Sequence, residues 1–263
     1  MNPSNVATAA KLLLEARRTG VAIKELPADC KPVTASDANE IVDEVTRHID
    51  DPIAGWKITF LYKPRERPFR APVFKSRTFA SPARIAAAIS PSRFIEPEIT
   101  FRLTRDLPPR TELYHAEEVA AAVEACPSFE IIATRFDTST RTLREMLNQR
   151  ATMVEAYADH ITSGAFVIGP PAQNWSNVDF ATMRVSMKAG GTTIVETVGG
   201  HAFINPFLPV VILANELRSK DGLKAGQFVA TGSFSGYFPV EPDQPVIADF
   251  EHIGRVEATF AAK

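Results

Sequence analysis

The stretch Phe94-Ile95-Glu96-Pro97-Glu98-Ile99-Thr100-Phe101-Arg102-Leu103 decides the fold. Its apolar residues recur at almost every second position, which is the period of a β-strand, and a proline is tolerated near a strand's beginning or edge. Alternate strand residues point to one side, so Glu96 and Glu98 should share a face, ~7 Å apart along the strand. Two neighbouring carboxylates repel each other, and each must raise its pKa or find a cation. A divalent cation with oxygen ligands meets this need, and the alternative is a solvated strand face with two acids.

A third carboxylate, Glu130, lies in a second β-rich run at residues 127–136. Burying a lone carboxylate is costly unless it is paired or coordinates a metal. Three carboxylates from two strands could supply half an octahedron, and water and a chelating substrate would complete the coordination of Mg²⁺. The alternative is a buried ion pair of Glu130 with Arg102 or Arg135, and spacing alone leaves both interpretations open.

These motifs, together with three others in the same order, resemble the 2-keto-4-pentenoate hydratase branch of the fumarylacetoacetate hydrolase superfamily along nearly the whole chain. The two strands match its Glu-x-Glu and Pro-x-x-Glu-Ile motifs. The other matches are Gly55-Trp56-Lys57-Ile58, the imperfect pair Ala158-Asp159-His160-Ile161-Thr162-Ser163 and Phe166-Val167-Ile168-Gly169, and Ala225-Gly226 through Thr231-Gly232-Ser233. The resemblance implies an α+β fold with a rolled, mixed sheet and surrounding helices, and a homo-oligomer.

The resemblance also implies the functional residues. Glu96, Glu98 and Glu130 would bind Mg²⁺ or Mn²⁺, and Lys57 and Asp159 would be catalytic. The substrate-binding residues would be His160, Thr162, Ser163, Thr231 and Ser233. Two of these assignments have structural alternatives, because Lys57 could be a solvated strand residue and Asp159 could cap or turn a helix end.

The function that the resemblance favours is a hydro-lyase of aromatic catabolism that adds water to a short 2-hydroxy-dienoate, the enol form of a 2-oxo acid. A 2-oxo-acid decarboxylase similar to 4-oxalocrotonate decarboxylase would use the same metal chelate. A C–C bond hydrolase would need a well-placed base, usually His with an acid, and no such pair is evident. An alternative from another class is a non-catalytic oligomer that binds oxo acids, since fold resemblance does not guarantee function.

Three residues depart from the branch's pattern, namely Lys75, His160 and Ala165. Lys75 follows a strand where relatives often carry acids, and Ala165 stands where they often carry Arg. His160 replaces an Asn. If His160 lines the cleft, nearby carboxylates should raise its pKa, so that substrate affinity would weaken as pH rises.

The composition is that of an ordinary globular protein, with 45% hydrophobic and 23% charged residues and a net charge of -2. A net charge of this size and sign gives no electrostatic reason to expect binding to nucleic acid or to an anionic membrane. The arginine-rich segment at residues 63–70 is predicted to be a solvated loop. Cys30 and Cys126 require no disulfide, and we expect a cytoplasmic protein without a secretory signal or transmembrane helix.

The predicted domains are a helical N-terminal layer over residues 1–50 and a catalytic domain over residues 51–263, packed as one unit. A first helix is predicted over residues 5–18, with Gly20 as its C-cap, and a second helix is predicted to begin at Ser36 or Asp37 as its N-cap. Further helices are predicted over residues 115–126, 142–158 and 206–217. Further strands are predicted from residues 55, 180, 227, 246 and 256. His201 and His252 lie in β-rich surroundings, and we interpret both as structural.

Overall fold

The computed structural model describes residues 1–61, 67–140 and 142–262, which form two compact units. Unit 1 comprises Met1–Pro52, Thr59–Pro72 and Thr134–Ser163, and unit 2 comprises Ile53–Ile58, Val73–Ala133 and Gly164–Lys263. The predicted boundary near residue 50 lies close to the end of the first segment of unit 1. The division of the chain into domains stays a prediction.

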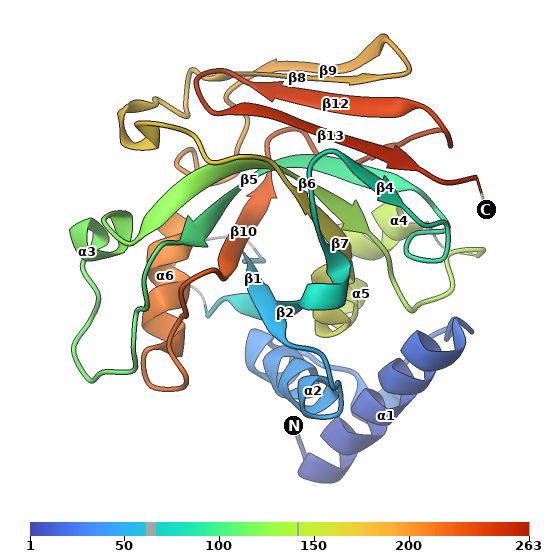
Figure 1. The fold of residues 1–263 in the computed structure, drawn as a ribbon. Helices are drawn as coiled ribbons and strands as arrows, with labels where there is room; N and C mark the ends of the chain where they lie inside the picture. The colour runs from blue at the N-terminus through green and yellow to red at the C-terminus, as the bar shows by residue number, and fades with distance from the viewer. Residues whose placement is uncertain (62–66, 141, 263) are drawn as a thin grey trace. The chain divides into compact units, whose positions relative to one another are not determined.

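Unit 1 is mainly helical (Figure 1). Its elements are α1 (Pro3–Thr19), η1 (Ala28–Cys30), α2 (Ala35–Arg47), α4 (Leu143–Asn148), α5 (Arg150–Ala158) and η3 (His160–Thr162). Helix α1 packs against α2, and α2 packs against α5, so that distant parts of the chain share one apolar core. The predicted first helix is confirmed, and Gly20 ends it in the left-handed conformation that glycine favours, at φ 72°.

Two helix boundaries in unit 1 differ from the predictions. The N-cap of α2 is Thr34, which forms a capping box with Asp37, so both predicted caps lie inside the helix. The helix predicted over residues 142–158 is divided into α4 and α5 at Gln149. The backbone of Gln149 is extended there, with φ −114° and ψ 126°, and this conformation ends the first helix.

Strand β2 (Phe69–Phe74) carries the chain from unit 1 into unit 2. Residues 63–66 of the arginine-rich segment lie outside the described residues. Arg70 is only 2% exposed, and its guanidinium donates to both carboxylate oxygens of Asp43 at 2.7 Å each. The prediction of a solvated loop is therefore wrong for Arg70, because its charge is neutralised by a bidentate partner from α2.

Unit 2 consists mainly of two sheets. Its elements are β1 (Ile53–Thr59), η2 (Lys75–Arg77), β3 (Thr78–Ala80), β4 (Ala83–Ile85), β5 (Phe94–Leu103), α3 (Ala116–Ala120), β6 (Val123–Ile132), β7 (Ser163–Ile168), η4 (Trp175–Asn177), β8 (Arg184–Ala189), β9 (Thr192–Val198), α6 (Leu208–Leu217), β10 (Phe228–Ser233), β11 (Phe238–Pro239), β12 (Pro245–Phe250) and β13 (Gly254–Phe260). One sheet contains the strand order β1-β10-β5-β6-β7-β3, and β11 also pairs with β5. The other sheet has the order β4-β13-β12-β8-β9.

The larger sheet is mixed, because β10 runs parallel to β1 and antiparallel to β5. Strand β6 packs against β12 and β13 of the second sheet, which lies above β5 and β6 in Figure 1. Helix α6 packs near β10 and α3. The predicted α+β class with a curled, mixed sheet and surrounding helices is confirmed.

The helix predicted over residues 115–126 ends at Ala120. Strand β6 begins at Val123 and pairs with β5 along its whole length, from Leu103 opposite Val123 to Phe94 opposite Ile132. This hydrogen-bonded ladder overrides the weak helical propensity of an alanine-rich segment. The strand predicted from residue 180 begins at Arg184, whereas the later strands and α6 lie close to their predicted positions.

Candidate metal centre

The register of β5 and β6 places three carboxylates on one face of the larger sheet. Glu96 pairs with Glu130, and Glu98 pairs with Ser128. Because alternate residues of a strand share a face, Glu96, Glu98 and Glu130 project together. The intervening apolar residues of β5, such as Ile99, are buried on the opposite face. The sheet therefore brings together the three acids that the sequence singles out.

One oxygen from each of the three carboxylates lies within 4.8 Å of the other two. Oxygens that share a divalent cation at ~2.0–2.6 Å each must lie within about 5 Å of one another. Glu98 and Glu130 are fully buried, and neither oxygen of Glu98 has a hydrogen-bond partner in normal geometry. A buried carboxylate is costly without compensation. The arrangement could therefore hold a divalent cation.

Lys57 adds a positive charge to this face from β1. It pairs with Ala230, which pairs with Thr100 two residues from Glu98, so Lys57 projects from the carboxylate face. Its ammonium group lies 2.5 Å from the carboxylate of Glu130. The side chain is buried, so the alternative of a solvated strand lysine is wrong.

The alternative arginine partners of Glu130 are engaged elsewhere. Arg102 pairs with Glu124, with Nη2 and a carboxylate oxygen 2.5 Å apart, and Arg135 pairs with Asp159 at 2.6 Å. The ion pair of Glu130 is thus made with Lys57. Burial lowers the pKa of Lys57, but the fields of the three carboxylates, that of Glu130 foremost, raise it above its ordinary value.

All three carboxylic acids hold their protons more tightly than usual. Burial is the main cause, and it raises the pKa to about 8 for Glu96, about 7 for Glu98 and about 8 for Glu130. Mutual repulsion raises these pKa values further, and the ammonium group of Lys57 lowers them. Near neutral pH, the centre without a cation therefore retains protons that a bound cation would displace.

A β-bulge in β10 lies beside Glu98. Ala230 pairs with Thr100 and Ser233 pairs with Glu98, so Thr231 and Gly232 together stand opposite Ile99 alone. Gly232 adopts φ 110°, a conformation that favours glycine. Its N–H favours the ionised form of Glu98 and lowers the pKa of that group, although the contact falls short of normal hydrogen-bond geometry.

The two predicted substrate-binding residues of β10 differ in their contacts. Thr231 is buried, and its hydroxyl has no hydrogen-bond partner, so it could bind a ligand oxygen. The hydroxyl of Ser233 accepts the N–H groups of Ser235 and Gly236, at 3.1 and 3.0 Å, and lies 3.3 Å from the carbonyl oxygen of Pro97. Ser233 therefore organises a turn, and its role in substrate binding stays a prediction.

Asp159 ends helix α5 in unit 1, at the position predicted from sequence. Its fully buried carboxylate accepts hydrogen bonds from Nε of Arg135 at 2.6 Å, from the backbone N–H of Arg135 at 2.8 Å and from the hydroxyl of Thr134 at 3.1 Å. The guanidinium of Arg17 lies 3.7 Å away. These contacts favour a structural role, and the catalytic role stays a prediction.

The turn after Asp159 is unusual because three consecutive residues have positive φ, namely His160 (51°), Ile161 (54°) and Thr162 (56°). This left-handed conformation costs roughly 1–2 kcal/mol per residue for side chains other than glycine. Arg135 compensates by donating to the carbonyl oxygens at both ends of the turn, Asp159 at 3.1 Å and Ser163 at 3.2 Å.

His160 is buried within unit 1. Burial lowers its pKa well below the usual range, and the positive charges of Arg17 and Arg135 lower it further. The predicted rise in the pKa of His160 is therefore wrong. Thr162 donates to the carbonyl oxygen of Ile161 at 2.7 Å, and Ser163 is buried at the start of β7. The substrate-binding roles of these three residues stay predictions.

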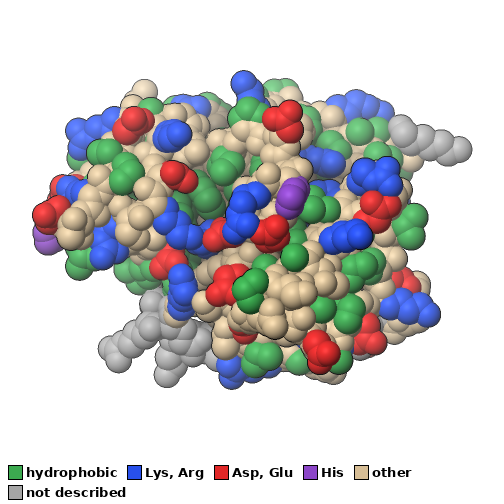
Figure 2. Space-filling view, turned by 90° about the horizontal axis from the view of Figure 1, so that it is seen from below, with side chains coloured by type: hydrophobic (Ala, Val, Ile, Leu, Met, Phe, Trp, Pro, Cys, Tyr) green, Lys and Arg blue, Asp and Glu red, His purple; other side chains and the backbone are tan. Residues whose placement is uncertain are grey.

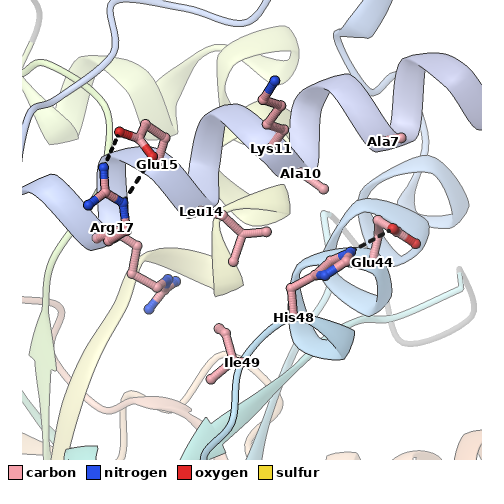
Figure 3. Close-up of a pocket in the computed structure, with 10 residues that line it drawn as sticks. Ala7, Ala10, Lys11, Leu14, Glu15, Arg17, Glu44, His48 and Ile49 are labelled. Carbon is pink, nitrogen blue, oxygen red and sulfur yellow. Dashed lines mark hydrogen bonds and ion pairs between the residues drawn. The ribbon is translucent and has the colours of Figure 1, made fainter.

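A hollow of about 620 Å³ opens in unit 1 between α1 and α2 (Figure 3). Apolar side chains such as Leu14 and Ile49 line it, and several charged groups around it form ion pairs. Glu15 lies 2.6 Å from Arg18, a further lining residue, and Glu44 lies 3.2 Å from His48. None of the predicted site residues lines this hollow, and we assign it no catalytic role.

Acidic and basic side chains are interspersed on the face of the protein drawn in Figure 2. Within the described residues, no helix combines the length and the apolar character of a transmembrane span. Cys30 and Cys126 are buried and form no disulfide.

Comparison with solved structures identifies the class of fold. A 4-oxalocrotonate decarboxylase from Pseudomonas putida G7, complexed with magnesium and adipate, superposes with a TM-score of 0.79 at 22% identity, covering 99% of this chain and 98% of that chain. A structure from Yersinia pestis CO92 assigned to the fumarylacetoacetate hydrolase family has a TM-score of 0.53 at 13% identity, covering 81% and 94%. The chain therefore shares its fold with these two proteins.

Comparison with curated proteins gives particular relatives. A 4-oxalocrotonate decarboxylase of Pseudomonas putida is 26% identical over 148 residues, which is 56% of this chain and 52% of the relative. A 2-keto-4-pentenoate hydratase of Dechloromonas aromatica (strain RCB) is 27% identical over 168 residues, or 64% and 60% of the two chains. The chain thus spans between half and two thirds of the length of these relatives.

A second decarboxylase, from Pseudomonas sp. (strain CF600), is 22% identical over 90% of both chains. No protein-family model matches the chain. The resemblance predicted from the motifs, to the hydratase branch of the superfamily, is confirmed by the hydratases and decarboxylases among these relatives.

Proposed function

We propose that the protein is a Mg²⁺- or Mn²⁺-dependent hydratase that adds water to a short 2-hydroxy-dienoate during catabolism of aromatic compounds. The observation that carries this proposal is the convergence of three carboxylates, two of them fully buried, within 4.8 Å on a face shared with Lys57. Support comes from relatives named 2-keto-4-pentenoate hydratase and from the similar fold of a decarboxylase complexed with magnesium.

The residues of unit 2 suit this chemistry. Glu96, Glu98 and Glu130 would hold the cation, which supplies Lewis-acid stabilisation of the negative charge that develops on the substrate's 2-oxygen. Lys57 remains an ammonium ion at neutral pH because its pKa is raised. It can therefore hydrogen-bond the substrate carboxylate, or hold at Nζ a proton that the reaction transfers. The buried hydroxyl of Thr231 could orient a second substrate oxygen.

The remaining parts of the proposal concern unit 1 and the assembly. His160, Thr162 and Ser163 would contact the substrate. The family resemblance implies a catalytic role for Asp159, and its ion pair with Arg135 supports a role in holding the turn that carries these three residues. We also propose a cytoplasmic homo-oligomer without nucleic-acid or membrane partners.

A second candidate function is decarboxylation of a 2-oxo acid. The observation that favours it is the similarity to 4-oxalocrotonate decarboxylases over nearly the full length of the chain. Loss of CO₂ would generate the same enolate charge beside the same carboxylate cluster. The two reactions thus require the same centre and differ in the group that leaves or adds.

The decisive experiment is incubation of the protein, loaded with Mg²⁺ or Mn²⁺, with a panel of 2-hydroxy-dienoates. Product mass separates the reactions, because hydration gives a product heavier by one water and decarboxylation gives one lighter by CO₂. We expect hydration that chelator abolishes. CO₂ release would favour the second candidate. Metal and oxo-acid binding without turnover of any substrate would instead indicate the non-catalytic oligomer.

A further inference from the structure

His201 lies in the loop between β9 and α6 of unit 2, and its ring is buried. The backbone N–H of Phe203 donates to its Nδ1 at 3.3 Å. Because Nδ1 accepts this hydrogen bond, Nε2 carries the proton of the neutral ring and is a donor. The aromatic rings of Phe203 and Phe234 pack around the imidazole, with centroids 5.8 and 5.1 Å away. The direction of Nε2 is therefore fixed.

The donor Nε2 faces the bulge in β10, where it is buried and has no hydrogen-bond partner in normal geometry. A Cβ atom placed on Gly232 would lie 3.8 Å from Nε2 of His201. Gly200, directly before His201, has φ 103°, and a Cβ there would lie 2.4 Å from the carbonyl oxygen of Phe234. No side chain fits that space, so the histidine loop is packed closely against the segment that follows the bulge.

The same bulge reaches the candidate metal ligands. The N–H of Gly232 favours the ionised form of Glu98. The N–H of Phe234 and the hydroxyl of Ser233 reach the carbonyl oxygen of Pro97, which separates Glu96 from Glu98, at 3.4 and 3.3 Å. Neither oxygen of Glu98 has a hydrogen-bond donor in normal geometry. The backbone segment nearest Glu98 on β10 therefore also lies beside Nε2 of His201.

We propose that His201 is a positioning residue for Glu98: Nε2–H attracts the backbone of Thr231 and Gly232 electrostatically, and the bulge then directs the Gly232 N–H at the Glu98 carboxylate. This inference rests on the proposed metal-dependent function. Groups behind a metal ligand orient it, and their loss typically weakens metal binding. Burial lowers the pKa of His201 to about 4, against the opposing effect of the Thr231 and Gly232 backbone, so the ring keeps its single donor at neutral pH.

Two substitutions separate the donor from the rest of the ring. Glutamine can place an amide N–H near the position of Nε2, whereas asparagine can reach only the position of Nδ1. We expect His201→Asn to weaken Mn²⁺ binding by about 10–100-fold, the usual effect of losing such a group. His201→Gln should bind Mn²⁺ nearly as tightly as the wild type. The exposed His252 provides the matched control, and His252→Asn should leave the affinity unchanged.

Mn²⁺ affinity is measured by calorimetry on folded full-length proteins, with kcat and KM for the best substrate recorded beside it. If the wild type binds Mn²⁺ and the His201→Asn variant binds it equally tightly, this inference alone is overturned. If the wild type does not bind Mn²⁺, the proposed function and this inference are overturned together. If His201→Asn does not fold, nitrogen NMR of isotope-labelled wild-type protein decides. We expect the Nε2–H tautomer at neutral pH and a shift of that resonance on addition of Mg²⁺, and a ring with the proton on Nδ1 would refute the inference.

Discussion

Replacement of Glu98 by glutamine should stabilise the cation-free protein at alkaline pH and remove stabilisation by divalent cations. Glutamine keeps the shape of the side chain and removes one of three negative charges that lie within 4.8 Å. At an effective dielectric constant of ~20, two unit charges at that distance repel by about 3.5 kcal/mol. Loss of the attraction between Glu98 and Lys57 offsets part of the relief. We therefore expect a net gain on the order of 3 kcal/mol when all the acids are ionised.

The pH dependence of this effect has a definite sign. Folding raises the pKa values of the three acids from 4.5 to about 7–8. Their contribution to stability is therefore fully present below pH 4.5 and is lost as pH rises through that upper range. Without a cation, the wild type should lose up to about 1.4 kcal/mol per pH unit for each acid that titrates. The Glu98→Gln variant should lose less.

Thermal unfolding from about pH 5 to about pH 8.5, with chelator or with Mn²⁺, tests both parts of the prediction. A gain on the order of 3 kcal/mol corresponds to roughly 5–10 °C in Tm for a protein of this size. Mn²⁺ at a hundred times its Kd should stabilise the wild type by about 2.7 kcal/mol and leave Glu98→Gln unchanged. The exposed Glu241, changed to glutamine, is the matched control. A variant that is less stable than wild type at alkaline pH without a cation, or that Mn²⁺ still stabilises, would refute the reasoning.

Three further predictions concern single residues. Lys57→Met should reduce turnover sharply while Mn²⁺ affinity, measured by calorimetry, holds or rises, because a nearby positive charge is lost; wild-type turnover would contradict the assigned role. Asp159→Asn should lower the free energy of unfolding by about 3–5 kcal/mol, since the largely buried guanidinium of Arg135 loses its carboxylate partner, and an unchanged denaturation midpoint would argue against this. His160→Asn should leave the dependence of substrate affinity on pH unaltered near neutrality, because the low pKa of His160 keeps the ring neutral; a flattened curve in the variant would restore a role for its protonation.

The carboxylate cluster could be predicted from sequence because its geometry follows from a local rule. Glu96 and Glu98 share a face through the two-residue period of β5 alone. Their convergence with Glu130 depends on register, since Glu96 lies opposite Glu130 only because β5 and β6 pair without a shift. A slip of one residue would turn Glu130 to the other face. The family motifs supplied that register indirectly.

The contacts of unit 1 were much less predictable. The low pKa of His160 results from burial and from Arg17 and Arg135, which are distant from it in sequence. The same two arginines surround Asp159, so a motif that resembles a catalytic segment forms a buried ion-pair cluster. No local signal in residues 158–163 reports these partners. The only sequence cue was that Asp159 ends an apolar helix, and this cue favoured the structural alternative.

The bulge and His201 were missed for a different reason. The only sequence signal of the extra residue in β10 is Gly232. A glycine at that position is explained equally well by the end of a strand. His201 reaches the bulge from the loop after β9, and no acidic residue beside it in sequence suggests a functional site. The role proposed for His201 depends on the direction of its Nε2 atom. Packing fixes that direction, and no pattern of residue types in the sequence predicts it.

The charges of the centre explain why protons, Lys57 and a cation are linked. Three ionised carboxylates and one ammonium group sum to a net charge of −2, which one divalent cation would neutralise. Without the cation, raised pKa values reduce the same charge by retaining protons. Binding of a cation must therefore release protons at neutral pH and strengthen as pH rises through the range of about 7–8.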